Sequence, residues 1–348
     1  MLRGYDMGDF RFGGRWIAFA LLAPVGAAAH HSRVQFEGNP IQEIQGELVS
    51  VSWANPHATF GVRVTNDSGE VETWQLESWG SPYVLSRMGV TREQFVVGTQ
   101  VRLAGRPSKW APDRFLLTNM LRPDGTEVVL TTDGDAFWDA RQIGGRSQWR
   151  TDRIATAAED GRGIFRVWST ARMGQARDNR IMLTERALAA RESFDQSQSF
   201  VVSCEPQGMP TVMNWVYPFE FTQVDPDTII LRNEYFDLVR TIHMAPASPP
   251  EDLAHSLLGY SVGHWEDDGR TLVVETTHLN WPYYDTIGTP LTPDVRITER
   301  FMLGDDPSTL IYRQIVTDPA TFTEPAVHES EHIALGETIE PFVCAADR

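Results

Sequence analysis

Apolar and polar residues alternate over much of the first third of the chain, from Ile41 to about Leu130. Successive side chains of a β-strand point to opposite faces, so this alternation predicts strands. Asn-Pro, Asn-Asp-Ser-Gly and Pro-Asp turn signals separate the alternating runs. Five strands are therefore predicted, over residues 46–53, 57–64, 71–78, 99–106 and 113–122.

A short helix is predicted between the third and fourth of these strands. Ser81 suits the N-cap, Pro82 the first helical position and Gly89 the C-terminal stop. Five strands with a helix in this position are typical of the OB-fold. We therefore predict an OB-like five-stranded barrel over residues 30–131, with a small β-sandwich as the alternative.

The second half of the chain is again rich in strand patterns, joined by short turns that favour antiparallel neighbours. The predicted strands cover residues 199–204, 213–224, 227–236, 238–244, 257–266, 270–279, 295–303, 308–317 and 326–333. Closing so many strands into a barrel would remove exposed sheet edges. The fold class is thus all-β, with a lipocalin-like antiparallel barrel of eight or nine strands over residues 199–348. Residues 132–198 are predicted as a linker that carries one helix, at 182–194.

The first 29 residues have the pattern of a secretory signal peptide. Arg3, Arg11 and Arg15 precede an apolar run over 16–25, which is too short to span a bilayer, and three alanines at 27–29 offer a cleavage site. The alternative is a buried N-terminal helix. No later stretch is long and apolar enough for a membrane span, so we expect a periplasmic or secreted protein.

Export would place the two cysteines, Cys204 and Cys344, in an oxidising compartment. They lie 140 residues apart in the sequence. In an oxidising compartment an even pair at the two ends of a domain predicts a disulfide. Two buried free thiols are the alternative.

Charge and missing motifs narrow the functional classes. The formal net charge of −17 argues against nucleic acid and anionic membrane surfaces as partners, because both recruit basic residues. The chain contains no P-loop, no G-x-S-x-G elbow and no G-x-G-x-x-G after a strand.

Two groups of motifs resemble an uncharacterised set of secreted bacterial proteins. The first group is HHS (30–32), WANPHATF (53–60), WQLES (74–78) and SPYVLSRMGVT (81–91). The second is CEPQGMP (204–210), YPFEF (217–221), GYSVGHWEDDGRTLVVETTHLN (259–280), TERF (298–301) and DPATFTEP (318–325). The resemblance implies an N-terminal domain of unknown function, a C-terminal lipocalin-like domain and export, and it implies no particular reaction.

Polar residues embedded in the barrel strands are the candidates for a site. We predict that the barrel binds an apolar ligand, such as a terpenoid, steroid or polyketide-like molecule, in a pocket with a few polar groups. Acid–base chemistry without a cofactor (isomerisation, cyclisation or hydration) would then transform it. The predicted acid–base residues are Glu275, Glu299, His243 and His264, and the predicted ligand-binding residues are Arg313, Trp265, Tyr217, Tyr260 and His278. A structural salt-bridge network and a solvent-facing set are the alternatives, as is a non-catalytic envelope binding protein.

The sequence HESEH matches the H-E-x-x-H zinc pattern at His328 and His332. That zinc site requires a helix, with both histidines on one face. Here the flanking residues predict a strand, on which the two histidines still share a face. We therefore do not expect a zinc protease.

A copper site is the competing hypothesis. Cleavage before His30 would free its amino group beside its imidazole, and His57 would supply a third nitrogen to complete a histidine brace. A flexible tail at His30 and His31, with His57 capping a turn, is the alternative.

This copper hypothesis predicts that the mature chain begins at His30 and binds one Cu(II), since the chelate needs the free amino group. Mass spectrometry of the exported protein identifies the first residue. Any other mature N-terminus removes the brace.

Overall fold

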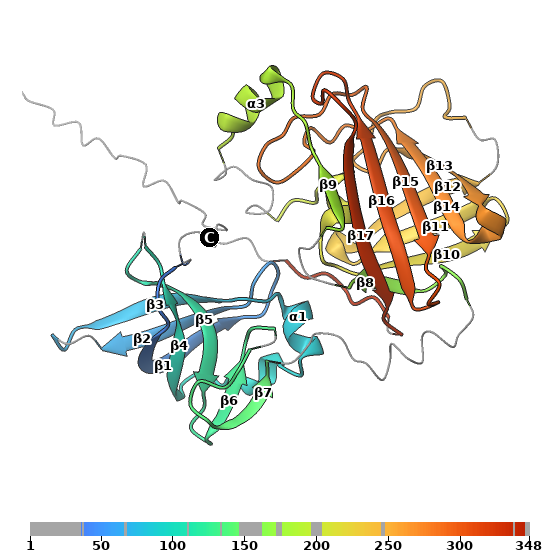
Figure 1. Ribbon diagram of the computed structural model, residues 1–348. Helices are drawn as coiled ribbons and strands as arrows, with labels where there is room; N and C mark the ends of the chain where they lie inside the picture. The colour runs from blue at the N-terminus through green and yellow to red at the C-terminus, as the bar shows by residue number, and fades with distance from the viewer. Residues whose placement is uncertain are drawn as a thin grey trace, which may run out of the picture.

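The computed structural model contains two closed β-barrels (Figure 1). It describes residues 36, 38–65, 68–109, 111–132, 134–145, 162–171, 176–195, 204–244, 248–336 and 338–344. The predicted signal peptide, His30 and His31 lie outside the described residues. Within the described residues, no helix is long and apolar enough to cross a membrane.

The first barrel confirms the OB-like prediction. Its strands are β1 (Gln42–Ser52), β2 (Thr59–Thr65), β3 (Val71–Ser78), β4 (Gln100–Pro107) and β5 (Arg114–Leu121). They pair in the order β3-β2-β1-β4-β5, and a parallel pairing of β3 with β5 closes the ring. Helix α1 (Pro82–Arg87) follows β3, with Ser81 accepting a bond from the backbone N–H of Val84. A 3₁₀ turn, η2 (Arg92–Gln94), precedes β4.

Two short strands extend this sheet beyond β5, namely β6 (Thr126–Val129) and β7 (Arg141–Gly144). Buried Glu127 of β6 joins them to the loop between them, because its carboxylate accepts bonds from the backbone N–H groups of Phe137 (2.5 Å) and Trp138 (3.1 Å). Residues 141–144, which belong to the stretch predicted as linker, therefore contribute to this sheet.

Nine strands close the second barrel, which confirms the predicted eight- to nine-stranded architecture. They are β8 (Val167–Thr170), β10 (Phe219–Asp225), β11 (Thr228–Asn233), β12 (Leu238–Met244), β13 (Tyr260–Glu266), β14 (Thr271–Thr277), β15 (Arg296–Leu303), β16 (Thr309–Thr317) and β17 (Ala326–Ala334). The pairing of β16 with β17 completes the ring. All neighbours are antiparallel except β12 and β13, which are parallel.

Several smaller elements complete this domain. Strand β9 (Asp178–Arg180) lies along β17, and helix α3 (Glu185–Glu192) occurs within the predicted helix 182–194. The 3₁₀ turns are η4 (Thr211–Asn214), η5 (Tyr235–Asp237) and η6 (Asp267–Gly269). Strands β8 and β9 both belong to the stretch predicted as linker, and β8 is part of the barrel wall.

The predicted disulfide between Cys204 and Cys344 is present. It joins Cys204, which precedes β10 in the chain, to Cys344 in the tail that follows β17. Such a link, closing a long loop, stabilises the fold by about 4 kcal/mol in the chain-entropy model. The disulfide fits an oxidising compartment. Of the predicted strand 199–204 only Cys204 is described, and it lies in a turn with φ of 52°.

The tail after β17 also connects the two barrels (Figure 1). Asn55, between β1 and β2, donates from its backbone and its side chain to the carbonyl oxygen of Val343, at 2.9 Å each. The side-chain oxygen of Asn55 accepts a bond from the buried hydroxyl of Tyr217 at 3.0 Å. One asparagine of the first barrel therefore contacts both the tail and the wall of the second barrel.

A buried acid lies at this junction. Glu234 is 2% exposed and accepts a bond from the backbone N–H of Glu340 in the tail, at 3.2 Å. Burial raises the pKa of Glu234 to about 7, although the Arg87 guanidinium of α1 opposes that shift. Near neutral pH this carboxyl group therefore changes between its protonated and ionised forms.

The raised pKa predicts a pH dependence of stability. Between the ordinary pKa of 4.5 and about 7, the folded state binds more protons at Glu234 than the unfolded state does. The free energy of unfolding therefore falls as pH rises through this window. Glu234→Gln removes that contribution, so the wild type should lose about 2–3 kcal/mol more than the variant between pH 5 and 8. Urea unfolding of both proteins at the two pH values measures the difference, and equal losses would contradict the prediction.

Candidate functional site

The interior of the second barrel has an aromatic part and a polar part. Side chains from one parity of each strand point inward and are buried. Those that make up the aromatic part are Trp168, Phe219, Phe221 and Phe301. The polar part is made by Arg240, Ser261, Thr276, Glu299, Tyr312 and Gln314, which we call the interior polar cluster.

A buried ion pair stands at the centre of the interior polar cluster. Arg240 of β12 bonds to Glu299 of β15, and their side chains are 3% and 0% exposed. Arg240 also donates to the hydroxyls of Ser261 (2.7 Å) and Thr276 (2.6 Å). The other oxygen of Glu299 accepts the hydroxyl hydrogen of Tyr312 at 2.9 Å. Both charges are thus hydrogen-bonded on several sides, as buried ions require.

Gln314 extends the cluster and leaves one atom unmatched. Its amide nitrogen donates to the hydroxyl of Tyr312 (2.6 Å) and to the carbonyl of Pro210 (3.3 Å). Its amide oxygen is buried and has no hydrogen-bond partner within the described residues. A buried acceptor without a donor costs about 1–3 kcal/mol, so its position in a native fold calls for an explanation.

The segment 207–213, which we call the cover segment, packs against the cluster. Met209, Val212 and Met213 are buried, and the sulfur of Met209 lies 3.8 Å from a guanidinium nitrogen of Arg240. The hydroxyl of Thr211 ties the segment to the 281–284 loop, because it accepts the indole N–H of Trp281 at 3.1 Å. The cover segment therefore separates the interior polar cluster from this loop.

His332 lies beside the aromatic part of the interior. Its ring is 5.1 Å from that of Phe219, and its Nε2 is 3.0 Å from the hydroxyl of Ser330. Burial, together with a smaller effect of the neighbouring His328, lowers the pKa of His332 to about 3. The ring is therefore neutral at physiological pH, and its Nδ1 has no partner among the described atoms.

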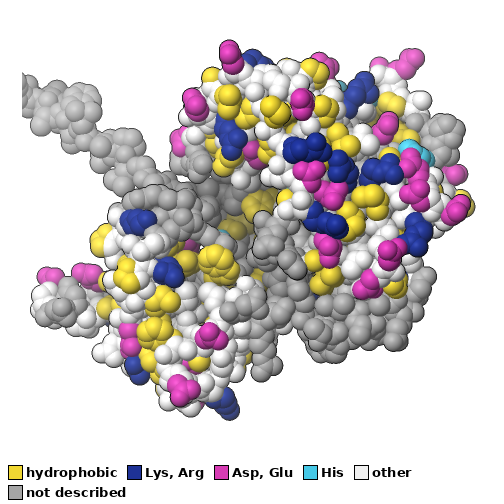
Figure 2. All heavy atoms as spheres, viewed as in Figure 1, with side chains coloured by type: hydrophobic (Ala, Val, Ile, Leu, Met, Phe, Trp, Pro, Cys, Tyr) yellow, Lys and Arg dark blue, Asp and Glu magenta, His cyan; other side chains and the backbone are white. Residues whose placement is uncertain are grey.

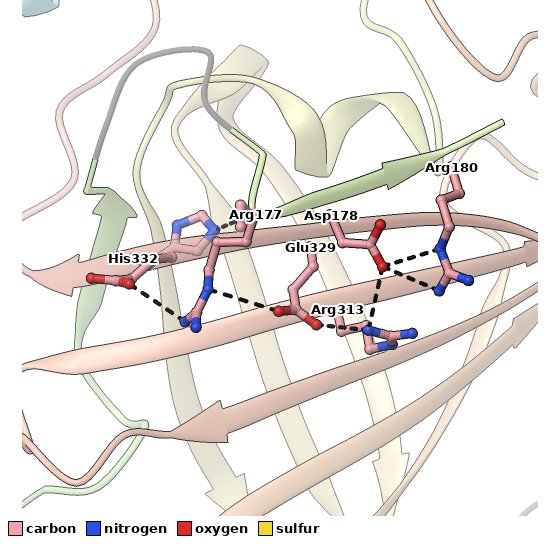
Figure 3. Close-up of polar contacts among 8 residues, drawn as sticks. Arg177, Asp178, Arg180, Arg313, Glu329 and His332 are labelled. Carbon is pink, nitrogen blue, oxygen red and sulfur yellow. Dashed lines mark hydrogen bonds and ion pairs between the residues drawn. The ribbon is translucent and has the colours of Figure 1, made fainter.

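The HESEH sequence forms part of β17, as expected, and not a helix. Inward-facing residues alternate with Glu329 and Glu331, which lie on the outer face. There Arg177 bonds to both glutamates and Arg313 bonds to Glu329 at 2.8 Å (Figure 3). Asp178 of β9 continues the row toward Arg313 and Arg180. Figure 2 shows basic and acidic side chains interleaved on this face. The glutamates thus hold β9 against β17.

The four predicted acid–base residues do not come together. Glu299 is the only one inside the barrel. Glu275 is exposed on β14, and His264 is exposed on β13, 3.2 Å from Glu266. His243 stacks on Tyr260, with ring centres 4.6 Å apart, on the outer face. Strand parity explains the difference, since Val274 and Thr276 face inward beside Glu275.

The predicted ligand-binding residues are also dispersed. Arg313 lies in the outer ionic row, so the expected grouping of Glu275, Glu299 and Arg313 is corrected: only Glu299 is internal. Trp265 is half-buried beside Phe165, and Tyr217 lies at the junction of the barrels. His278 directly follows β14, with its ring near His255.

Sequence reasoning missed Arg240, Tyr312 and Gln314, although a signal was present. Arg240 shares its parity with Ile242 and Met244, and Gln314 stands between Tyr312 and Val316. A polar residue with apolar neighbours at two-residue spacing marks an inward-facing position. That test, applied to both parities of each strand, would have found them.

The predicted copper site lies only partly within the described residues. No group of three or more His, Cys, Asp or Glu lies close enough to hold a metal within the part of the chain that the structure describes. His57, half-buried between β1 and β2, is described, but His30 is not. The histidine brace therefore stays a prediction.

One family model matches the N-terminal part of the chain. A model described as "Family of unknown function (DUF6152)" matches residues 20–113, which include most of the first barrel. This match fits the expected uncharacterised N-terminal domain. No curated protein matches the chain.

The buried ion pair predicts an asymmetric response to mutation. Glu299→Gln leaves the Arg240 charge uncompensated and should lower the free energy of unfolding by about 3–5 kcal/mol. Adding Arg240→Met removes that charge and should restore most of the loss. The matched control is Glu275→Gln on the exposed face, which should change stability by less than about 0.5 kcal/mol. Urea unfolding followed by tryptophan fluorescence measures all three, and equal effects of Glu299→Gln and Glu275→Gln would contradict the prediction.

Proposed function

We propose that the second barrel binds a small, mainly apolar molecule that carries a hydrogen-bond donor such as a hydroxyl group. The observation that supports this is the unmatched amide oxygen of Gln314 within the interior polar cluster. A ligand hydroxyl would satisfy that oxygen, while the apolar wall would bury the rest of the molecule. Terpenoid and steroid alcohols have this chemistry.

The ligand would bind at the polar part of the interior, beneath the cover segment. Bulky side chains fill the aromatic part, where Trp168 and Phe301 are completely buried. The cover segment reaches Gln314 mainly through the carbonyl of Pro210, a long bond of 3.3 Å. Outward movement of this segment would therefore break few polar contacts with the cluster and would make room beside Gln314.

Turnover of the ligand by acid–base chemistry is a separate proposal. Glu299 would be the proton-transferring group, because it alone of the predicted acid–base residues lies inside the barrel. Arg240 and Tyr312 would hold its carboxylate in place. Glu299→Gln, compared with Glu275→Gln, would then abolish conversion of a bound substrate. Copper binding through His30 and His57 is the competing proposal, with the mature N-terminus as its test.

Menthol and menthone test the binding proposal, because they share a carbon skeleton and only menthol donates a hydrogen bond. The wild type should bind menthol about tenfold more tightly, equivalent to roughly 1.4 kcal/mol for the added bond. Gln314→Met removes the acceptor and should abolish the preference. Titration calorimetry gives the affinities, and Gln223→Met on an exposed strand position is the control. Equal binding of the two compounds by the wild type, or binding of neither, would contradict the proposal.

A further inference from the structure

Two histidines outside the barrel interior lie ring against ring. His255 belongs to the loop before β13 and His278 directly follows β14, and their ring centres are 5.2 Å apart. His255 is exposed and His278 is half-buried. The pair is therefore accessible from solvent, and neither residue takes part in the interior polar cluster.

Hydrogen bonds fix the two histidine-bearing segments against each other. Ser256 forms a parallel bridge with Leu279. The backbone N–H of Ser256 donates to the carbonyl of His278 at 2.9 Å, and that of Asn280 donates to the carbonyl of Ser256 at 3.0 Å. The Asn280 side chain donates to the carbonyl of His255 at 3.2 Å. The backbone positions of both histidines are therefore set by the fold, without any bound ion.

One nitrogen of each ring is occupied, and the other is available. Nδ1 of His255 lies 3.0 Å from the carbonyl of Leu279. A carbonyl only accepts, so this nitrogen carries the proton and Nε2 keeps its lone pair. Nδ1 of His278 lies 2.9 Å from the hydroxyl of Thr277, which can accept a hydrogen bond from Nδ1–H and so leave the lone pair on Nε2. Among the described residues, neither Nε2 has a hydrogen-bond partner. A bond from Nδ1–H to a carbonyl is the contact that commonly orients a metal-binding histidine.

We propose that His255 and His278 bind one divalent transition-metal ion through their Nε2 atoms, with zinc as the ion of best geometric fit. With zinc–nitrogen bonds of about 2.0–2.1 Å, two imidazoles at a tetrahedral angle have ring centres roughly 5 Å apart. The observed separation of 5.2 Å agrees with that geometry. Neutral imidazole is a suitable ligand for zinc, and the net charge of −17 favours the approach of cations.

The site would provide two protein ligands and leave two positions for water or an external ligand. This is consistent with the finding that no cluster of three or more potential ligands occurs among the described residues. His278 adopts a left-handed backbone conformation, with φ of 59°. That conformation, uncommon for residues other than glycine, takes His278 out of the strand alternation at the end of β14.

Equilibrium dialysis of the full mature protein against zinc chloride at pH 7.5 tests the proposal. Two variants remove one ligand each: His255→Gln, and His278→Asn, in which asparagine tolerates the left-handed backbone. Each should bind one zinc equivalent fewer than the wild type, and the double variant should lose only that same equivalent. Any metal held near the N-terminus is retained in all proteins and does not affect the difference.

The control is His264→Gln, which removes an exposed histidine elsewhere on the barrel and should leave zinc stoichiometry unchanged. Near-ultraviolet circular dichroism establishes that each variant is folded. A wild type that binds no zinc, or a zinc stoichiometry that the His255 and His278 variants leave unchanged, would overturn the proposal.

Discussion

A guanidinium and a carboxylate share the interior of the second barrel, and much of the surrounding structure keeps both of them hydrogen-bonded. Removing two ions from water is costly, and the cost is recovered only if every remaining hydrogen-bonding position is filled. The hydroxyl groups of Ser261, Thr276 and Tyr312, on three different strands, provide these bonds to Arg240 and Glu299. The register of the strands around the ring therefore has to bring these particular side chains to the same level.

Along β16 and β17, residues that face the barrel interior alternate in the sequence with residues that form the outer ionic row. Along β16, Tyr312 and Gln314 face inward while Arg313 between them faces outward. Along β17, Ser330 and His332 face inward, and the neighbouring glutamates join the outer ionic row (Figure 3). One face of each strand thus lines the barrel interior, and the other attaches β9 to the barrel. A shift of register by one residue would exchange the two sets and destroy both.

Much of the fold was predictable from periodicity, because most strands are amphipathic and end at recognisable turns. The boundaries of 71–78 and 238–244 agree with β3 and β12, and the capping residues of α1 were identified from their types. The strands that were missed, β6 to β9, have three or four residues each. So short a stretch contains too few alternations to stand out, and partner strands distant in sequence determine its conformation.

The site was less predictable than the fold. Apolar and polar residues that alternate in sequence define the two faces of a strand. When both faces carry apolar residues, this pattern does not show which face points into the barrel. Val273 and Val274 are both buried, and so the direction of Glu275 between Val274 and Thr276 was ambiguous. Glu299 was identified because its neighbours at two-residue spacing are a buried isoleucine and phenylalanine. Its partner Arg240 is 59 residues away, and only closure of the ring brings the two together.

The position of the disulfide has a mechanical consequence. A pulling force applied between the two ends of the chain would pass from Cys204 to Cys344 through the sulfur atoms. The loop that carries β10 to β17 lies outside that covalent path. The contacts of Asn55 with the tail, together with β8 and β9, would be loaded first. Force would therefore reach the strands around Arg240 and Glu299 only through the hydrogen bonds that β8 makes with β10 and β17 and that β9 makes with β17.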